Sequence, residues 1–376
     1  MIILIIAVST ILFTYILIVV NLYRGLLKIP ALKTDSSSHE YISVVISAHN
    51  ESENLPGLMS TLARQDYPKN LHEVIIVNDR STDQTSNVLQ EYTASVHNLK
   101  TIHIGEIQAD FSPKKYAIDR AISNARGSLI LLTDADGRPG PGWIRAMGSY
   151  FSGKTGLVIG YAPYSVDPPY DRLIFKILAL EYMSHACIAA ATAGLGFPIT
   201  CVGTNLAYYK SVYLDMGGFG QYRSYHSGDD DLFMQRVRDE SNSRISYAFS
   251  AAAHVYNAPP SSWNQFFNQR LRYASKGFFY PLFVTAGLIV YYLFNLLLLI
   301  LAVLALFQFS FILIFSSIFV IKIISEFFLL RKFASMAGQK NLLKYFLPTA
   351  VLHIPYIVFF GFLGSVMKYK WAGREK

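Results

Sequence analysis

The stretch LILLTDADG at residues 129–137 determines how we expect this chain to fold. Its four leading apolar residues show no alternation, which indicates a strand buried on both faces, as in a parallel sheet. The run ends abruptly in Asp134 and Asp136, two carboxylates one residue apart. Because ligands of open α/β sheets bind beyond the carboxyl ends of such strands, these side chains lie where a ligand would bind.

The two carboxylates of this stretch also suggest a metal ion. Carboxylates this close repel each other unless a cation lies between them and a phosphate. Mg²⁺ and Mn²⁺ take such oxygen ligands and usually share them with a nucleotide. The alternative is a solvated turn after a strand, because Asp-x-Asp also occurs in ordinary loops.

The composition indicates a membrane protein. Of the 376 residues, 52% are hydrophobic, and the mean hydropathy is +0.31. Residues 1–20 carry no charged side chain and are long enough to cross a hydrocarbon core of ~30 Å. We therefore assign residues 1–22 to an N-terminal transmembrane anchor, not a cleaved signal peptide, and residues 23–40 to a linker. Arg24, Lys28 and Lys33 follow the anchor, which predicts a cytoplasmic position for the next domain.

The net charge of +8 does not indicate nucleic-acid binding, because much of the basic excess flanks apolar segments. Anionic lipid headgroups are the simpler partner. The chain has only two cysteines, Cys187 and Cys201, and no Cys-x-x-Cys pair. Neither a disulfide framework nor a zinc site is therefore indicated.

Strands and helices alternate after the linker, and polar clusters follow successive strands. We expect strands at residues 41–47, 74–77, 100–104 and 129–133, and helices at 53–64, 83–92 and 114–124. This alternation predicts a doubly wound α/β domain of the nucleotide-binding type.

Several ordered motifs resemble those of the membrane-bound family 2 glycosyltransferases, which have a GT-A fold. The motifs are VVISAHNE (44–51), VIIVNDRSTDQT (74–85), LLTDADGRPGPGW (131–143), GTNLAY (203–208), GDDDLFMQRV (228–237) and QRLRY (269–273). They resemble the D, D, D, Q-x-x-R-W pattern, except that Tyr273 replaces Trp. The resemblance covers residues 41–277, which we assign to a GT-A nucleotide-sugar-binding domain with a Rossmann-like, mostly parallel sheet.

The resemblance implies a role for each matched residue on the donor side. Asp79 would hydrogen-bond the nucleobase, and Glu51 would shape the nucleotide pocket. Asp134 would face the ribose or the metal, and Asp136 would bind the metal on the sugar diphosphate. Lys114 would lie near the nucleotide, although Lys115 is an adjacent alternative.

Three consecutive carboxylates precede a predicted helix at 232–237. They are either a charged helix start, which the helix dipole favours, or a crowded site in which one raised pKa suits a general base. The family's Glu-Asp-x-x-Leu-x-x-Arg-Leu segment aligns Asp229 with Glu and Asp230 with Asp. Asp230 is therefore our candidate base, and Asp229 is the alternative if the register shifts by one residue.

Two further segments are predicted to lie at the membrane surface. Residues 174–199 are unusually apolar and are read either as a helix and loop that admit a lipid acceptor or as a buried core helix. Residues 263–277 mix aromatic and basic side chains, as an interfacial helix does. Gln269 and Arg272 share one face of that helix, so that Arg272 can approach the diphosphate while its neighbour Tyr273 and Gln269 contact substrate.

The C-terminal part, residues 278–366, is assigned to transmembrane helices, followed by a basic tail at 367–376. Apolar segments occur at about 280–307, 309–330 and 345–366. In the second segment, Lys322 and Glu326 are four residues apart and suited to pair. A third full crossing would place the basic tail outside, so we expect the proline-containing last segment to be re-entrant or interfacial.

The sequence thus predicts an integral-membrane, inverting hexosyltransferase of the inner or plasma membrane with a cytoplasmic catalytic domain. It would transfer a sugar from a UDP-sugar, or a GDP-sugar, to a hydroxyl of a lipid or lipid-linked acceptor, with Mg²⁺ or Mn²⁺. A processive polysaccharide synthase is the alternative among enzymes. A nucleotide-sugar-binding membrane protein without catalysis is the alternative from another class.

Overall fold

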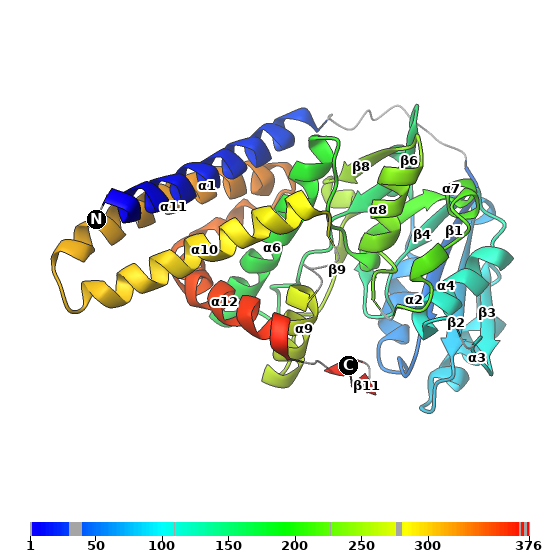
Figure 1. The fold of residues 1–376 in the computed structure, drawn as a ribbon. Coiled ribbons are helices and arrows are strands. Elements are labelled where there is room, and N and C mark those ends of the chain that lie inside the picture. The colour runs from blue at the N-terminus through cyan, green and yellow to red at the C-terminus, as the bar shows by residue number, and fades with distance from the viewer. Residues whose placement is uncertain are drawn as a thin grey trace.

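The structure, a computed structural model, describes residues 2–29, 40–108, 110–225, 227–275, 280–367, 370–371 and 374–375. A sheet domain lies beside a bundle of long helices, and the N-terminal helix belongs to this bundle (Figure 1). Most of the predicted linker, the end of the predicted interfacial helix and half of the basic tail lie outside the described residues.

The central sheet has seven strands in the order β3-β2-β1-β4-β7-β6-β8. The strands β1 to β4 are parallel, β6 and β8 are parallel, and β7 is antiparallel to both β4 and β6. These strands are β1 (Ile42–Ala48), β2 (His72–Asp79), β3 (Leu99–Ile104), β4 (Leu129–Leu132), β6 (Thr155–Gly160), β7 (Leu206–Tyr209) and β8 (Arg244–Ala248). The predicted mostly parallel α/β sheet is confirmed.

Helices cover both faces of this sheet. They are α2 (Leu55–Ala63), α3 (Thr85–Ser95), α4 (Pro113–Asn124), α5 (Trp143–Ser149), α7 (Lys210–Asp215) and α8 (Asp231–Glu240). The apolar side chains of α4 pack on one face, and those of α2, α3 and α5 pack on the other. Every residue of β2 and β4 is buried, as their unbroken apolar runs predict.

Short elements complete the sheet domain and the C-terminal end. The two-stranded pairs are β5 (Arg138–Pro139) with β9 (Val255–Tyr256) and β10 (Lys370–Trp371) with β11 (Arg374–Glu375). Single turns of 3₁₀ helix occur at Lys69–Leu71, Gly203–Asn205, Gly220–Tyr222 and Ala251–Ala253, and a longer one at Lys340–Tyr345.

Five of the described helices are long and apolar enough to cross a membrane. They are α1 (Ile2–Lys28), α6 (Leu173–Gly194), α10 (Leu282–Ala305), α11 (Ser310–Met336) and α12 (Phe346–Val366). The helix α9 (Trp263–Ser275) is shorter and lies between this bundle and the sheet domain (Figure 1). The chain thus has the architecture of an integral membrane protein.

The last apolar segment differs from the expected re-entrant turn. The helix α12 continues without a break from Phe346 to Val366, although it contains Pro355. A re-entrant segment would have to turn back within this stretch, and α12 does not turn back. The interfacial alternative, and with it the expectation that the segment does not cross the membrane fully, stays a prediction. Neighbouring helices compensate for a proline in such a helix, and α12 packs against α9 and α10.

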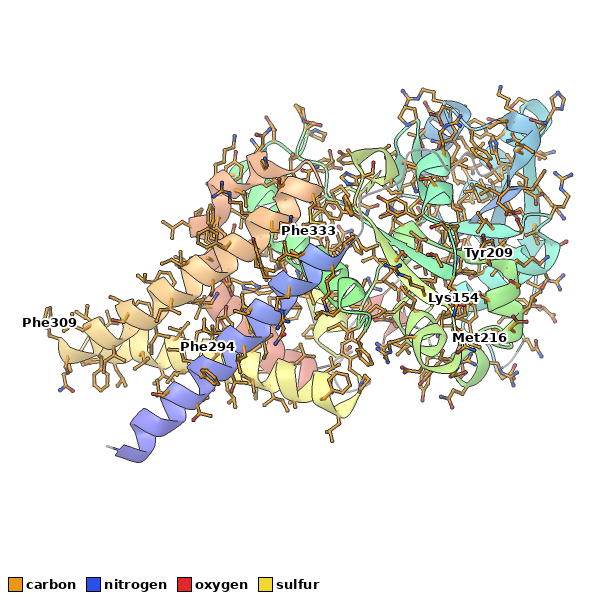
Figure 2. All side chains as sticks on the ribbon, turned by 90° about the horizontal axis from the view of Figure 1, so that it is seen from above. Lys154, Tyr209, Met216, Phe294, Phe309 and Phe333 are labelled. Carbon is orange, nitrogen blue, oxygen red and sulfur yellow. The ribbon has the colours of Figure 1, made fainter. Side chains whose placement is uncertain are left out.

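Close packing holds the helices of the bundle together and joins the bundle to the sheet domain. At the crossing of α1 and α6, a Cβ atom added to Gly25 would lie 2.1 Å from the Ala191 carbonyl oxygen, so only glycine fits there. Phe333 of α11 contacts the rings of Tyr161, which directly follows β6, and of Tyr247 on β8. Figure 2 shows Phe333 where the helices meet the sheet domain, far from Phe309 at the opposite end of the bundle.

Polar side chains within the bundle satisfy one another. Lys322 Nζ lies 2.5 Å from Glu326 Oε2, as the four-residue spacing predicts. The Tyr15 hydroxyl of α1 donates a hydrogen bond of 2.7 Å to Glu326 Oε1. A charged residue inside a membrane bundle is costly unless it is paired, so this trio holds α1 against α11 at low cost.

Candidate active site

One cavity of about 1600 Å³ extends from the carboxyl ends of the central strands to the membrane helices. Its walls include the aspartates at the strand ends and the apolar side chains of α1, α6, α10 and α12. All ten site residues predicted from the sequence line it: Glu51, Asp79, Lys114, Asp134, Asp136, Asp229, Asp230, Gln269, Arg272 and Tyr273.

The loops after β1 and β2 form one end of the cavity. Asp79 is 3% exposed, and its Oδ1 accepts a hydrogen bond of 2.8 Å from Arg80 Nε. Asn50 and Arg80 both have positive φ angles, 58° and 51°, which are uncommon for residues other than glycine. Such strained backbone often occurs at functional sites, where the surrounding structure holds it in place.

Glu51 lies in the first of these loops. Its backbone N–H donates to Thr85 Oγ1 at 2.8 Å, and its Oε2 accepts from Asn54. Burial raises the pKa of Glu51, and the charges of Asp136 and Asp134 add to the shift. The parallel pairing of β1 with β4 thus brings the carboxylates after the two strands close enough to act on one another.

Lys114 links the carboxylate of Asp134, after β4, to that of Asp229, before α8. Its Nζ lies 2.8 Å from Asp134 Oδ1 and 3.0 Å from Asp229 Oδ2. Burial alone would lower the pKa of Lys114, but the charges of these two aspartates raise it well above the ordinary value. Lys115 points elsewhere, because its Nζ donates to the carbonyl oxygens of Tyr222, Tyr225 and Ser227.

Asp134 and Asp136 have different environments although they are one residue apart. Thr204 Oγ1 donates to Asp134 Oδ2 at 2.6 Å, so both oxygens of Asp134 already have protein partners. Burial would raise the pKa of Asp134, but Lys114 and Thr204 hold it below its ordinary value. Confinement in the cavity raises the pKa of Asp136 to about 6, and the charge of Asp134 adds to the shift.

The residues at this point fit a hard divalent cation. The Asp136 carboxylate opens into the cavity, and no other described side chain donates a hydrogen bond to it. Within the described residues, no group of three or more His, Cys, Asp or Glu side chains is arranged to hold a metal alone. A cation at Asp136 would therefore complete its ligand shell with diphosphate oxygens and water, as Mg²⁺ usually does.

The three aspartates before α8 take different positions. Asp229 is 7% exposed and forms the ion pair with Lys114. Asp230 is the N-cap residue of α8, and its two oxygens accept from the N–H groups of Gly203 and Asp231. Asp231 Oδ1 accepts from the Leu232 N–H at 3.0 Å. Asp230 is thus fixed in orientation at the cavity wall, whereas Asp229 is bound to Lys114.

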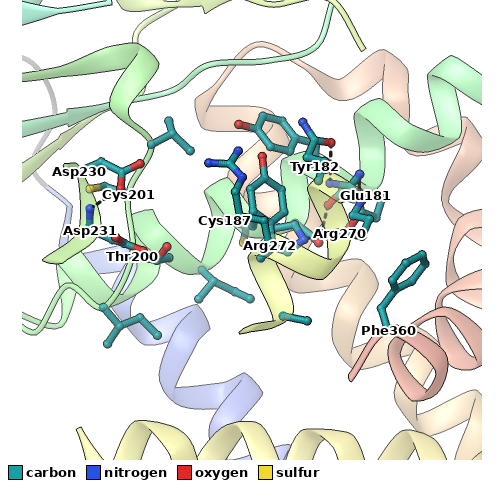
Figure 3. A pocket seen from close by; sticks show the side chains of 18 of the residues that line it. Glu181, Tyr182, Cys187, Thr200, Cys201, Asp230, Asp231, Arg270, Arg272 and Phe360 are labelled. Atoms are coloured by element: carbon teal, nitrogen blue, oxygen red, sulfur yellow. Dashed lines mark hydrogen bonds and ion pairs between the residues drawn. The ribbon is translucent and has the colours of Figure 1, made fainter. Parts of the chain in front are cut away.

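The helix α9 places its polar side chains between the aspartates and the membrane helices. Gln269 Oε1 accepts a hydrogen bond of 3.1 Å from the Tyr164 hydroxyl. The Arg272 guanidinium lies 5.3 Å from the centre of the Tyr273 ring. In the close-up of Figure 3, Arg272 lies between Asp230 and the pair formed by Arg270 and Glu181.

The Arg270–Glu181 ion pair was not predicted from the sequence. Arg270 is fully buried at its side chain, and its Nη2 binds Glu181 Oε2 of α6. His185 Nε2 lies 3.0 Å from the other Glu181 oxygen. The pair could not be predicted from a local pattern, because 89 positions separate Arg270 from Glu181. The QRLRY motif drew attention to this part of the chain, but it singled out Arg272. The pair ties α9 to α6.

Thr204 is the second functional contact that the sequence reasoning missed. It lies in the quoted GTNLAY motif, but no local pattern connects it with Asp134, 70 positions earlier. The antiparallel pairing of β7 with β4 brings the two together, because Thr204 lies in the 3₁₀ turn that precedes β7 and Asp134 lies just after β4.

The class of protein follows from comparisons with known families. The model for Glycosyl transferase family group 2 matches residues 129–363, and the model for Glycosyl transferase family 2 matches residues 43–178. The chain belongs to the family 2 glycosyltransferases, which confirms the resemblance stated from its motifs.

Individual relatives are similar to this chain over only part of its length. The probable glycosyltransferase YdaM of Bacillus subtilis is 25% identical over 249 residues, which are 65% of this chain and 57% of YdaM. The beta-monoglucosyldiacylglycerol synthase of Synechocystis sp. is 28% identical over 128 residues, 34% of this chain and 26% of that protein. The chain thus spans little more than half of YdaM and less of that synthase.

A solved structure supports the fold. The mannosyltransferase PcManGT from Pyrobaculum calidifontis has a TM-score of 0.57 and 16% sequence identity to this chain. The similarity covers 93% of this chain and 97% of that one, so it includes both the sheet domain and the helices.

Proposed function

We propose that this protein transfers a hexose, with inversion, from a nucleotide sugar to a hydroxyl of a lipid or lipid-linked acceptor at the membrane. One observation carries the proposal: a single cavity is lined by the strand-end aspartates and by the membrane helices. A soluble donor can enter at the end lined by the aspartates, and a lipid can reach the same space from the end lined by the membrane helices.

The chain's own residues would divide the work of donor binding. Asp79 and Glu51 would hold the nucleoside, while Lys114 keeps Asp134 and Asp229 in place. Asp136, together with Asp134, would bind Mg²⁺ or Mn²⁺. When bound, the cation neutralises charge on the diphosphate leaving group. Arg272 would stabilise the same leaving group through charge-assisted hydrogen bonds.

Asp230 would act as the general base. The acceptor hydroxyl oxygen attacks the anomeric carbon and forms the new glycosidic bond as the bond to the diphosphate oxygen breaks. The hydroxyl proton passes to Asp230, and the nucleoside diphosphate leaves with the electron pair of the broken bond. The N–H groups of Gly203 and Asp231 fix the carboxylate of Asp230 for this role. Asp229 is the alternative base, although its ion pair with Lys114 favours a supporting role.

Relatives support the classes of donor and acceptor. PcManGT was solved with GDP-Man and Mn²⁺, and the Synechocystis relative is named for a glycolipid product. A UDP-sugar is the first donor to test and a GDP-sugar the second. The basic residues near the C-terminal end of α1, Arg24 and Lys28, support a cytoplasmic catalytic domain, because such residues are enriched on that side.

The test uses the purified full-length protein in lipid nanodiscs with Mn²⁺ and a panel of labelled UDP- and GDP-sugars. We expect one or two sugars to appear on lipid from one of these donors. A polymer would support a processive synthase instead. Tight donor binding without hydrolysis or transfer from any donor would contradict the proposal and favour a binding protein.

A further inference from the structure

Carboxylates outnumber Lys and Arg side chains among the described residues that line the cavity. Its described lining residues include nine carboxylates: Glu51, Asp79, Asp134, Asp136, Glu181, Asp229, Asp230, Asp231 and Glu326. The same lining includes three Lys or Arg side chains, Lys114, Arg270 and Arg272. Lys114 and Arg270 are already bound to carboxylates of the cavity.

The polar groups on the membrane side are balanced among themselves. Arg270 and His185 both contact Glu181, and Lys322 and Tyr15 both contact Glu326. An uncharged group that binds beside these pairs leaves their balance intact. A phosphate monoester would add up to two negative charges between Glu181 and the aspartates at the start of α8. Among the described lining residues, Arg272 is the cation that lies between these carboxylates, and the proposed function assigns it to the diphosphate of the donor.

The membrane side is also rich in tyrosine. Eight tyrosines line the cavity: Tyr15, Tyr164, Tyr182, Tyr273, Tyr280, Tyr291, Tyr292 and Tyr356. A tyrosine offers an apolar ring face and a hydroxyl that donates and accepts hydrogen bonds. Tyr164 and Tyr182 stack with ring centres 4.2 Å apart. The rings of this wall suit the C–H faces of a sugar headgroup. The hydroxyls of Tyr15 and Tyr164 donate to Glu326 and Gln269, so they can only accept hydrogen bonds from the hydroxyls of the headgroup.

The proposed general base also favours an acceptor that reacts through an alcohol hydroxyl. An alcohol hydroxyl must lose its proton as it attacks, so it requires a carboxylate base. A phosphate oxygen is already ionised at neutral pH and requires no base. Asp230, held by two backbone N–H groups and flanked by Asp229 and Asp231, is arranged for the alcohol.

We propose that the acceptor is a lipid with an uncharged, hydroxyl-rich headgroup, such as a glycosylated diacylglycerol, and not a lipid phosphate. This inference rests on the proposed function and narrows its acceptor class. The reacting oxygen is then a sugar or glycerol hydroxyl near Asp230, and the headgroup lies against the tyrosines of the cavity.

The test compares two acceptors in vesicles of uncharged phosphatidylcholine: a monoglycosyl diacylglycerol and a polyprenyl phosphate. Full-length protein, Mn²⁺ and labelled UDP- and GDP-sugars are supplied to both. We expect transfer to the neutral glycolipid to be at least about tenfold faster. Equal or faster transfer to the phosphate would overturn the inference and leave the proposed transferase function standing. If neither acceptor is labelled and no donor is turned over, the proposed function fails, and the inference fails with it.

A variant tests the tyrosine wall separately. The Tyr280 hydroxyl lies 3.5 Å from Asp231 Oδ2 at the cavity wall. In the proposed complex the Tyr280 hydroxyl would also accept a hydrogen bond from the headgroup. Tyr280→Phe should therefore raise KM for the neutral glycolipid about three- to tenfold and leave the donor KM within about twofold. Tyr92→Phe on the distant helix α3 is the matched control. An unchanged acceptor KM in Tyr280→Phe would count against recognition by this wall.

Discussion

The two ends of the cavity are built in different ways. At the donor end, the carboxylates Glu51, Asp79, Asp134 and Asp136 lie at the carboxyl end of a strand or within four residues of it, so short motifs in the sequence place them. At the membrane end, the functional contacts join helices that are far apart in the chain, such as Arg270 of α9 and Glu181 of α6. The comparison teaches that the strand-end motifs predict the donor site, whereas the acceptor site depends on how the helices pack.

The strongest test of this contrast is Asp230→Asn, because Asp230 lies where the two ends meet. The amide retains the size of the side chain but cannot accept the acceptor proton. We expect kcat to fall about 10²- to 10⁴-fold, with donor affinity near wild type. Steady-state kinetics and donor titration by calorimetry measure the two quantities.

The control for this variant is Asp239→Asn, an exposed aspartate on the same helix α8. If Asp229→Asn loses activity while Asp230→Asn retains it, the register of the base shifts by one residue. If both variants retain full activity, this segment has no catalytic role.

At the donor end, Asp136→Asn should remove the carboxylate that is most available to a cation. Loss of a group that merely supports a metal ligand costs about 10- to 100-fold, so loss of the ligand should lower kcat/KM by roughly 100-fold. Donor binding should weaken as well, which distinguishes this variant from Asp230→Asn. Titration of Mn²⁺ and a nucleoside diphosphate measures the effect.

Asp167→Asn, at an exposed position in the loop before α6, is the control for Asp136→Asn. Wild-type transfer by Asp136→Asn, or full activity in the presence of a chelator, would show that the assignment of Asp136 to the metal is incorrect.

At the membrane end, Glu181→Gln should act first on stability. It leaves the buried Arg270 guanidinium without its charged partner, and breaking a buried ion pair costs about 3–5 kcal/mol. We expect the melting temperature in detergent to fall by several degrees. Glu91→Gln, on the exposed side of α3, should leave it unchanged.

The double variant Glu181→Gln with Arg270→Met sharpens this test. Removing both charges should recover part of the lost stability, because no unpaired charge remains buried. If Glu181→Gln melts at the wild-type temperature, the pair does not hold α9 to α6.

The smallest effect is expected for Asp231→Asn. Its carboxylate accepts from the N–H of Leu232 in the first turn of α8. Loss of a negative charge at a helix start costs about 0.3–1 kcal/mol of stability. Because Asp231 has no assigned role in the reaction, kcat should remain within about threefold of wild type. A loss as large as that of Asp230→Asn would place Asp231 in the catalytic machinery.

These differences also show what the sequence could predict. The apolar runs of β2 and β4 indicated buried parallel strands, and the structure places their carboxyl ends at one edge of the sheet. The α/β fold could therefore be predicted from the sequence, and the resemblance to the family's motifs singled out the ten residues that line the cavity. The Lys322–Glu326 pair was also predictable, because helical spacing brings the two residues onto one face.

Contacts across long chain separations were not predictable in this way. Lys114 joins Asp134 to Asp229, and Thr204 bonds Asp134 across the β4–β7 pairing. No local periodicity encodes such contacts. The continuity of α12 was not predictable for a related reason: Pro355 and the charge rule are local features, whereas packing against α9 and α10 supports the unbroken helix.

A structure of the full-length protein in nanodiscs, determined with Mn²⁺, a nucleoside diphosphate and an added neutral glycolipid, tests the shared cavity most directly. We predict the diphosphate and Mn²⁺ beside Asp136, the nucleoside beside Asp79, and the glycolipid headgroup beside Asp230 in the same cavity. A nucleotide bound away from these aspartates, or a glycolipid found only on the outer surface of the helices, would contradict the account.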